Sequence, residues 1–191
     1  MKNKKSRSLK FQKNQFAFCI FKLIALLLFF CSPGHSEVVD EKIEGTFGKW
    51  LKVCNSKTSN CVGVAFAENE AGKKVARFVI DRRQTSNNAV KAVGTLLIPY
   101  DFALPHLPSG SILMVDKNES IKEKFLFCDL NGCTVRFMFT ELGIKLLKEG
   151  SNILIKIRDV RSPRPARNMD IPLDGLKSLY SSLGNNNSSA D

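Results

Sequence analysis

The chain of 191 residues lacks most of the residue patterns on which common enzyme mechanisms depend. It has two histidines, and only His106 lies beyond the first 36 residues. Glycine-rich dinucleotide and phosphate loops, H-E-x-x-H zinc helices and spaced acidic calcium loops are all absent. A Ser-His-Asp or Cys-His mechanism needs an imidazole beside a nucleophile, and one histidine in an apolar turn is weak support for it. An enzyme is therefore the weaker hypothesis, and we predict no catalytic residue, no cofactor and no metal.

Acidic residues are absent from the first 36 positions, although seven of the 29 lysines and arginines lie there. The formal net charge is +11, but the remaining 22 basic and 18 acidic residues give only +4. A charge of this size in the body does not indicate a nucleic-acid-binding protein. The excess of basic residues belongs to the N-terminal stretch and needs a separate explanation.

Residues 1–36 have the three parts of a secretory signal peptide. Residues 1–15 are basic and polar, residues 16–31 are apolar apart from Lys22, and small or turn-forming residues follow up to Ser36. The apolar run is shorter than the roughly 20 residues that span a bilayer, and Lys22 would be costly inside one. We therefore predict cleavage near Ser36, export to the periplasm, cell surface or medium, and no membrane span in the mature chain.

Two other fates of the leader stay open. It can remain uncleaved as an anchor, or Cys31 can be lipid-modified, as in bacterial lipoproteins. Phe30 is bulkier than the residue that precedes a lipidated cysteine, so simple cleavage is favoured.

The body, residues 37–183, reads as a mainly β domain, followed by a polar tail over residues 184–191 that is predicted to be disordered. Alternation is clear where Val135, Phe137 and Phe139 oppose Arg136 and Met138. This spacing of short apolar runs and turn residues predicts an antiparallel β-sandwich. The predicted strands cover residues 50–54, 61–67, 74–81, 90–98, 111–115, 123–128, 133–139 and 152–158.

Two short helices are predicted late in the chain. Thr140 is a suitable cap for residues 141–149, and Asp174 is a suitable cap for a second helix that ends before Gly184. The inward faces are predicted to be Leu142, Leu146 and Leu147 in the first helix, and Leu176, Leu179, Tyr180 and Leu183 in the second.

Four of the six cysteines lie in the body, where they allow three disulfide pairings. Cys128 and Cys133 flank an Asn-Gly turn, and Cys54 and Cys61 flank a polar turn, so local geometry favours these two pairs. In an oxidising compartment disulfides are the default fate of such thiols. A zinc site made from all four thiolates is the rival interpretation, but the spacing from Cys54 to Cys61 is longer than usual for zinc.

Three short motifs follow one another along the body. They are F-G-x-W-x-x-x-C over residues 47–54, F-x-x-C-x-x-N-G-C over residues 125–133, and I-P-L-x-G-L over residues 171–176. In this order, behind a signal peptide, they resemble the invasion-associated locus B family of alphaproteobacterial exported proteins. The resemblance implies an immunoglobulin-like antiparallel β-sandwich, two local disulfides, a periplasmic or cell-surface location, and a virulence role in host-cell association.

Two surfaces are candidates for binding. The arginine segment, residues 158–167, contains Asp159 as its only acidic residue and carries a charge of +3. It could bind anionic lipid headgroups or acidic glycans, or it could be a solvated connection. The apolar turn, residues 98–108, would mark an interaction site if exposed, or would fold onto the end of the sandwich. The candidate anion-binding residues are Arg158, Arg161, Arg164 and Arg167.

These observations predict a non-enzymatic exported protein that acts through its surface on an envelope or host-cell component. The alternative is a periplasmic envelope-stress or assembly factor without a host-facing role. A third class, a zinc-dependent or thiol enzyme, would require bound metal or a titratable thiol.

Overall fold

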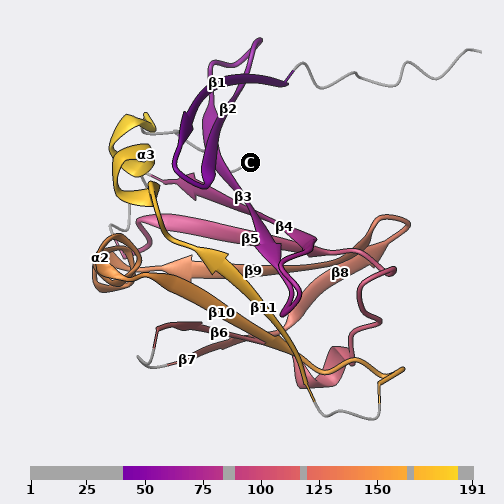
Figure 1. Ribbon diagram of the computed structural model, residues 1–191. Helices are drawn as coiled ribbons and strands as arrows, with labels where there is room; N and C mark the ends of the chain where they lie inside the picture. The colour runs from indigo at the N-terminus through magenta and orange to yellow at the C-terminus, as the bar shows by residue number, and fades with distance from the viewer. Residues whose placement is uncertain (1–40, 84–88, 117–119, 163–165, 185–191) are drawn as a thin grey trace, which may run out of the picture. The chain divides into compact units, whose positions relative to one another are not determined.

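The computed structural model describes residues 41–83, 89–116, 120–162 and 166–184 (Figure 1). The chain divides into Met1–Val38 and a compact body, Val39–Asp191. The predicted signal peptide, Arg164 and most of the predicted tail lie outside the described residues. None of the helices described is long and apolar enough to cross a membrane.

The body consists mainly of β-strands. The strands are β1 (Glu41–Phe47), β2 (Trp50–Asn55), β3 (Cys61–Glu68), β4 (Lys74–Arg82), β5 (Ala92–Ile98), β6 (Ser111–Val115), β7 (Ser120–Glu123), β8 (Phe125–Asp129), β9 (Gly132–Phe139), β10 (Asn152–Ile157) and β11 (Arg167–Pro172). The helices are the 3-10 turn η1 (Leu107–Ser109), α2 (Glu141–Glu149) and α3 (Leu176–Ser182).

A single hydrogen-bonded sheet contains these strands, in the order β7-β6-β10-β11-β3-β4-β5-β9-β8, with β2 also paired to β3 and β1 paired to β2. Every pairing between the described strands is antiparallel. Only Lys124 separates the edge strand β7 from the edge strand β8, so the chain passes directly from one end of the sheet to the other. The sheet therefore nearly closes into a barrel-like structure.

The predicted mainly antiparallel fold with two short helices is confirmed, but its division into the two separate sheets of an immunoglobulin-like sandwich is not what the structure has. β11, which the sequence did not predict, pairs with β10 along its length and joins β3 through the single pair Asp170 and Glu68. This pair makes one continuous sheet. The predicted strand over residues 123–128 belongs to two strands, because Glu123 lies in β7, which pairs with β6, and residues 125–128 lie in β8, which pairs with β9.

The core lies on the inner face of this sheet. The alternation predicted around Phe137 and Phe139 is confirmed, since both are buried while Arg136 and Met138 are exposed. Trp50 packs edge-on against Phe78, with ring centroids 6.1 Å apart, and both rings are fully buried. Such aromatic burial contributes a large share of the hydrophobic stabilisation of a domain of this size.

Two of the sequence motifs, far apart in the chain, meet in a contact that we call the clasp, formed by residues 47–50 and 172–175. The Trp50 indole donates to the Pro172 carbonyl at 2.9 Å, and the Lys49 amide donates to the Asp174 carbonyl at 3.2 Å. Gly175 has a φ of +86°, and a Cβ atom there would overlap the Phe47 carbonyl. These contacts therefore bring together two motifs from opposite ends of the described body.

Both helices pack against the sheet and against each other (Figure 1). Thr140 caps α2 as predicted, accepting from the Gly143 amide at 3.4 Å. The predicted inward position of Leu142 is wrong, because Ile144 and Leu147 occupy the buried face and leave Leu142 66% exposed.

The buried face predicted for α3 is confirmed, since Leu176, Leu179, Tyr180 and Leu183 are all buried. The predicted Asp174 cap is wrong. Gly175 occupies the N-cap position in a left-handed conformation, which the clasp requires.

Candidate anion-binding site

The four cysteines of the body form two disulfides in the structure, Cys54 with Cys61 and Cys128 with Cys133. Within each pair the two residues lie directly opposite each other on neighbouring antiparallel strands, β2 with β3 and β8 with β9. These are the two pairings that local geometry favours. A disulfide sulfur carries no thiolate charge, so this arrangement does not provide the four-thiolate zinc site of the rival interpretation.

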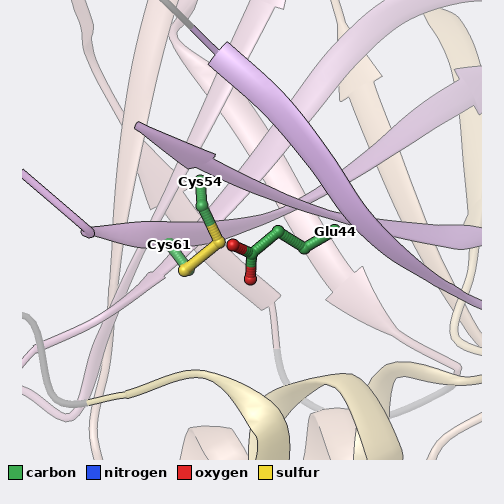
Figure 2. Close-up of side chains that lie close together, drawn as sticks. All are labelled: Glu44, Cys54 and Cys61. Carbon is green, nitrogen blue, oxygen red and sulfur yellow. A yellow bond between two sulfur atoms is a disulfide. The ribbon is translucent and has the colours of Figure 1, made fainter. Parts of the chain in front are cut away.

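Glu44 on β1 lies close to the first disulfide, and its carboxylate points toward the two sulfur atoms (Figure 2). The possible ligand atoms of Glu44, Cys54 and Cys61 lie within 4.8 Å of one another. Because both sulfurs are bonded to each other, only the carboxylate remains as a charged ligand, and it also pairs with Lys52 at 3.3 Å. This group is a structural disulfide beside an ion pair.

The arginine segment and the apolar turn, which the sequence treats as separate surfaces, are in contact. The Val160 amide donates to the Leu104 carbonyl at 3.0 Å, and the His106 amide donates to the Arg158 carbonyl at 2.8 Å. An isolated bridge also pairs Pro105 with Asp159. The turn therefore folds onto the described part of the arginine segment, although Leu104 and Leu107 remain partly exposed.

His106 has a local role in this turn. Its Nδ1 atom lies 2.7 Å from the Ser109 hydroxyl, three residues along the same 3-10 turn. No carboxylate is hydrogen-bonded to the other ring nitrogen within the described part of the chain. The contact holds the 3-10 turn Leu107–Ser109, which follows Leu104 in the chain.

Asp159 holds the apolar turn and the arginine segment together, and its side chain has no solvent exposure. Its Oδ1 atom accepts from the amides of Leu104 and Arg161, at 3.2 and 3.0 Å. The Nε atoms of Arg161 and Arg167 lie 3.4 and 3.1 Å from its two oxygens. Burial alone would raise the pKa of Asp159, but the hydrogen bonds from Leu104 and Arg161 and the Arg161 charge outweigh burial and lower the pKa below its ordinary value.

Both arginines contact Asp159 through Nε, so their terminal guanidinium nitrogens are not needed to hold this arrangement. Arg161 and Arg167 are 46% and 44% exposed, and both line a cavity of about 640 Å³. A buried carboxylate thus orients two partly exposed guanidinium groups, which are well suited to binding oxyanions.

The β3–β4 hairpin contributes basic side chains to the wall of the same cavity. The charged residues that line it are Lys73, Lys74, Arg77, Asp101, Arg161 and Arg167. Five cations therefore face one carboxylate, in a volume typical of small-molecule sites. Because like charges gathered in a concave surface attract anions, the cavity is a candidate anion-binding site.

Aromatic rings position two of these cations. Lys74 Nζ lies 4.9 Å from the centroid of Phe66, and the Arg167 guanidinium carbon lies 5.8 Å from the centroid of Phe102. Such contacts contribute about 0.5–1 kcal/mol each at exposed sites. Arg77 instead pairs with Glu41 at 3.5 Å, in an exposed ion pair that contributes little to stability.

A second cavity, of about 410 Å³, adjoins the first and shares Asn69, Phe102 and Arg167 with it. Glu70 and Asn168 line only this smaller cavity. The Asn168 amide oxygen is buried and has no hydrogen-bond partner among the described residues. An unpaired buried acceptor costs about 1–3 kcal/mol, so the wall of the smaller cavity contains an unsatisfied side-chain amide.

Sequence reasoning identified only part of this site. It selected Arg161 and Arg167, which line the cavity, and Arg158, which is exposed and lines neither cavity. It missed Lys73 and Lys74, although two adjacent lysines after a turn at Gly72 were a visible signal. It had no means to find Asn168, because the position of this residue depends on the unpredicted strand β11.

Comparison with known proteins gives two findings. The family model described as invasion associated locus B (IalB) protein matches residues 50–184. The solved structure of invasion associated protein B from Bartonella henselae is similar to this chain, with a TM-score of 0.59 and 18% sequence identity, covering 72% of this chain and 92% of that one. At this identity the structural likeness shows a shared fold. No curated protein matches the chain.

Proposed function

Because the chain belongs to the invasion associated locus B (IalB) family, we propose that it is an exported, non-enzymatic protein that acts through its surface in cell-envelope or host-cell association. The basic cavity beside Asp159 is the observation that carries the proposal. A buried carboxylate that orients two arginines toward a cavity with three more cations is suited to holding an anion. Anionic groups are abundant on bacterial envelopes and on host-cell surfaces.

Two further features support an extracytoplasmic location. The two disulfides suggest an oxidising compartment, since such bonds are rare in reducing cytosol. The basic and apolar leader over residues 1–36 supports export by the secretory route.

A deletion strain tests the role directly. We expect the strain to lose adherence to host cells or the integrity of its envelope, and the wild-type chain to restore the lost property. A chain with Lys73→Gln and Lys74→Gln should restore it poorly, because both changes remove cations from the cavity without touching the core. A deletion strain that is normal in both assays would contradict the proposal.

Protease treatment of intact cells decides between the two locations. Loss of the protein under treatment would place it on the cell surface, as host-cell association requires. A protein that survives on intact cells and is cut only after the outer membrane is opened would favour the alternative role, an envelope-stress or assembly factor in the periplasm.

A further inference from the structure

We infer that the two adjoining cavities form one binding site for a phosphorylated sugar, with the phosphate in the larger cavity and the sugar hydroxyls in the smaller one. This inference rests on the proposed function, because it names the chemical class of the anion that the same surface would bind. It is carried by three properties of the described residues, namely their charge, their hydrogen-bonding groups and the walls that the two cavities share.

The charge of the larger cavity matches a phosphate monoester. Its five cations are opposed by Asp101 in the wall and by two ion-pair partners, Glu41 on Arg77 and Asp159 on the two arginines. These charges leave a formal +2, and a phosphate monoester carries about −1.5 to −2 near neutral pH. A single carboxylate or sulfate ester would leave the cavity with an excess of positive charge.

The smaller cavity has polar groups suited to the sugar part of the ligand. The polar groups that line it and not the larger cavity include the Glu70 carboxylate and the side-chain amide of Asn168, whose oxygen is buried and unpaired. A carboxylate accepts from hydroxyl donors and repels a second phosphate, and an amide can pair with a hydroxyl through its oxygen or its NH2 group. The hydroxyls of a sugar ring supply such donors in several directions.

The shared walls place the two halves of such a ligand next to each other. Arg167 lines both cavities, and the next residue, Asn168, lines the smaller one. The Arg167 guanidinium lies over Phe102, which also borders both cavities. A ligand whose phosphate is attached directly to its sugar would therefore reach both sets of groups.

Titration calorimetry of the oxidised protein tests the inference with three soluble probes, namely glucose 1-phosphate, inorganic phosphate and glucose. We expect saturable binding of glucose 1-phosphate, about ten-fold or more tighter than that of inorganic phosphate, and no measurable binding of glucose. Lys74→Gln should weaken binding of glucose 1-phosphate by about ten-fold. Asn168→Ala should weaken binding of glucose 1-phosphate and leave that of inorganic phosphate unchanged.

The matched control is Lys177→Gln, which removes the same charge from an exposed position on α3 that lines neither cavity. If Lys177→Gln weakens binding as much as Lys74→Gln, the attraction is a general effect of net charge and the inference is wrong. If inorganic phosphate binds as tightly as glucose 1-phosphate, and Asn168→Ala changes neither, the sugar part is wrong.

Vesicle co-sedimentation distinguishes a free sugar phosphate from a lipid headgroup. Phosphatidylcholine vesicles carry either monophosphoryl lipid A or an equal charge of phosphatidylglycerol. Binding of the lipid A vesicles alone, lost in Lys74→Gln, would support the site and identify a lipid headgroup as its source. Equal binding of both vesicle types, or no binding of any probe, would overturn the inference.

The tests of the ligand and the tests of the proposed function can fail independently of each other. Failure of every probe, with a deletion strain that does lose host-cell or envelope association, would reject the ligand and retain the role. Specific binding of glucose 1-phosphate, with a deletion strain that is normal in both assays, would retain the site and reject the role.

Discussion

At Asp159, a carboxylate without solvent exposure holds two arginines that are themselves nearly half exposed. A buried charge is tolerated only when it is paired and hydrogen-bonded, and this one receives two amides and two guanidinium groups. The arginines can turn toward water, but the amides of Leu104 and Arg161 cannot without moving their chain segments. The carboxylate therefore contributes both to stability and to the orientation of the cations at the cavity.

Asp159→Asn should lower the free energy of unfolding by about 1–3 kcal/mol near neutral pH. The asparagine has only one acceptor oxygen for the donors that now bind two carboxylate oxygens. Thermal unfolding of the two proteins measures the difference. Asp101→Asn is the control, since it removes a carboxylate from an exposed position of the same cavity and should change stability by less than about 0.5 kcal/mol.

The pH dependence gives this prediction a second measurement. The pKa of Asp159 is lowered in the folded state, so its contribution to stability is complete above the unfolded pKa of about 4. That contribution is lost as the pH falls through the lower, folded pKa. The gap between wild type and Asp159→Asn should therefore narrow below about pH 4, and a gap that widens there would contradict the assignment.

At the scale of elements, the clasp joins the loop between β1 and β2 to the start of α3. Its contacts are close because two backbones approach where no side chain intervenes, at Gly48 and Gly175. Both glycines have a positive φ, which other residues adopt only at a cost. The helix α3, with its buried leucines, is therefore anchored at its first turn by backbone geometry rather than by a side-chain cap.

Gly175→Ala should lower the free energy of unfolding by about 3 kcal/mol, because the added Cβ meets the Phe47 carbonyl in addition to the cost of the left-handed backbone. Gly72→Ala is a matched control. Its φ of +73° is similar, but no atom lies within 4 Å of the added Cβ, so it should cost only about 1 kcal/mol. Equal losses in chemical denaturation would show that the clasp has no role beyond backbone conformation.

Much of the β-sheet could be predicted from the sequence because its inner strands alternate strongly. β9 and β10 are buried on one face and partly exposed to solvent on the other, so hydrophobic residues recur at every second position. β1 has no such period, since its residues are nearly all exposed. β11 does alternate, but Met169 and Ile171 are its only buried residues and it begins at an arginine. β1 therefore depends on its pairing with β2, and the alternation in β11 is too short to identify a strand by itself.

The residues of the candidate site also divide into those that a local pattern identifies and those that only the fold brings together. Arg161 and Arg167 were visible as a local charge cluster, as was the apolar turn that includes Phe102. Their convergence with Lys74 depends on the pairing of β11 with β3, a contact between residues about a hundred positions apart. Local patterns in one sequence do not show which distant residues pair. The cavity could therefore be found only from the folded structure of the whole molecule.

The two disulfides also act at that scale, and we expect them to contribute unequally. Loop entropy alone gives about 2 to 2.5 kcal/mol for each, because both rings are small. Cys54 and Cys61 are both buried, and their bond joins β3 to the strand that carries Trp50 and the clasp. Cys128 is exposed, and its bond closes only the hairpin at the edge strand β8.

Replacing Cys54 and Cys61 by alanine should therefore lower the melting temperature more than replacing Cys128 and Cys133. Thermal unfolding of both double variants, with mass spectrometry of the remaining pair, measures this difference. The reason is that loss of the first bond removes two buried sulfur atoms and loosens β2. Loss of the second removes one, at Cys133, and its hairpin keeps the Asp129 and Gly132 pairing. Four free thiols in the exported wild-type protein would reject both bonds, and a larger loss at the β8–β9 hairpin would reject the proposed ranking.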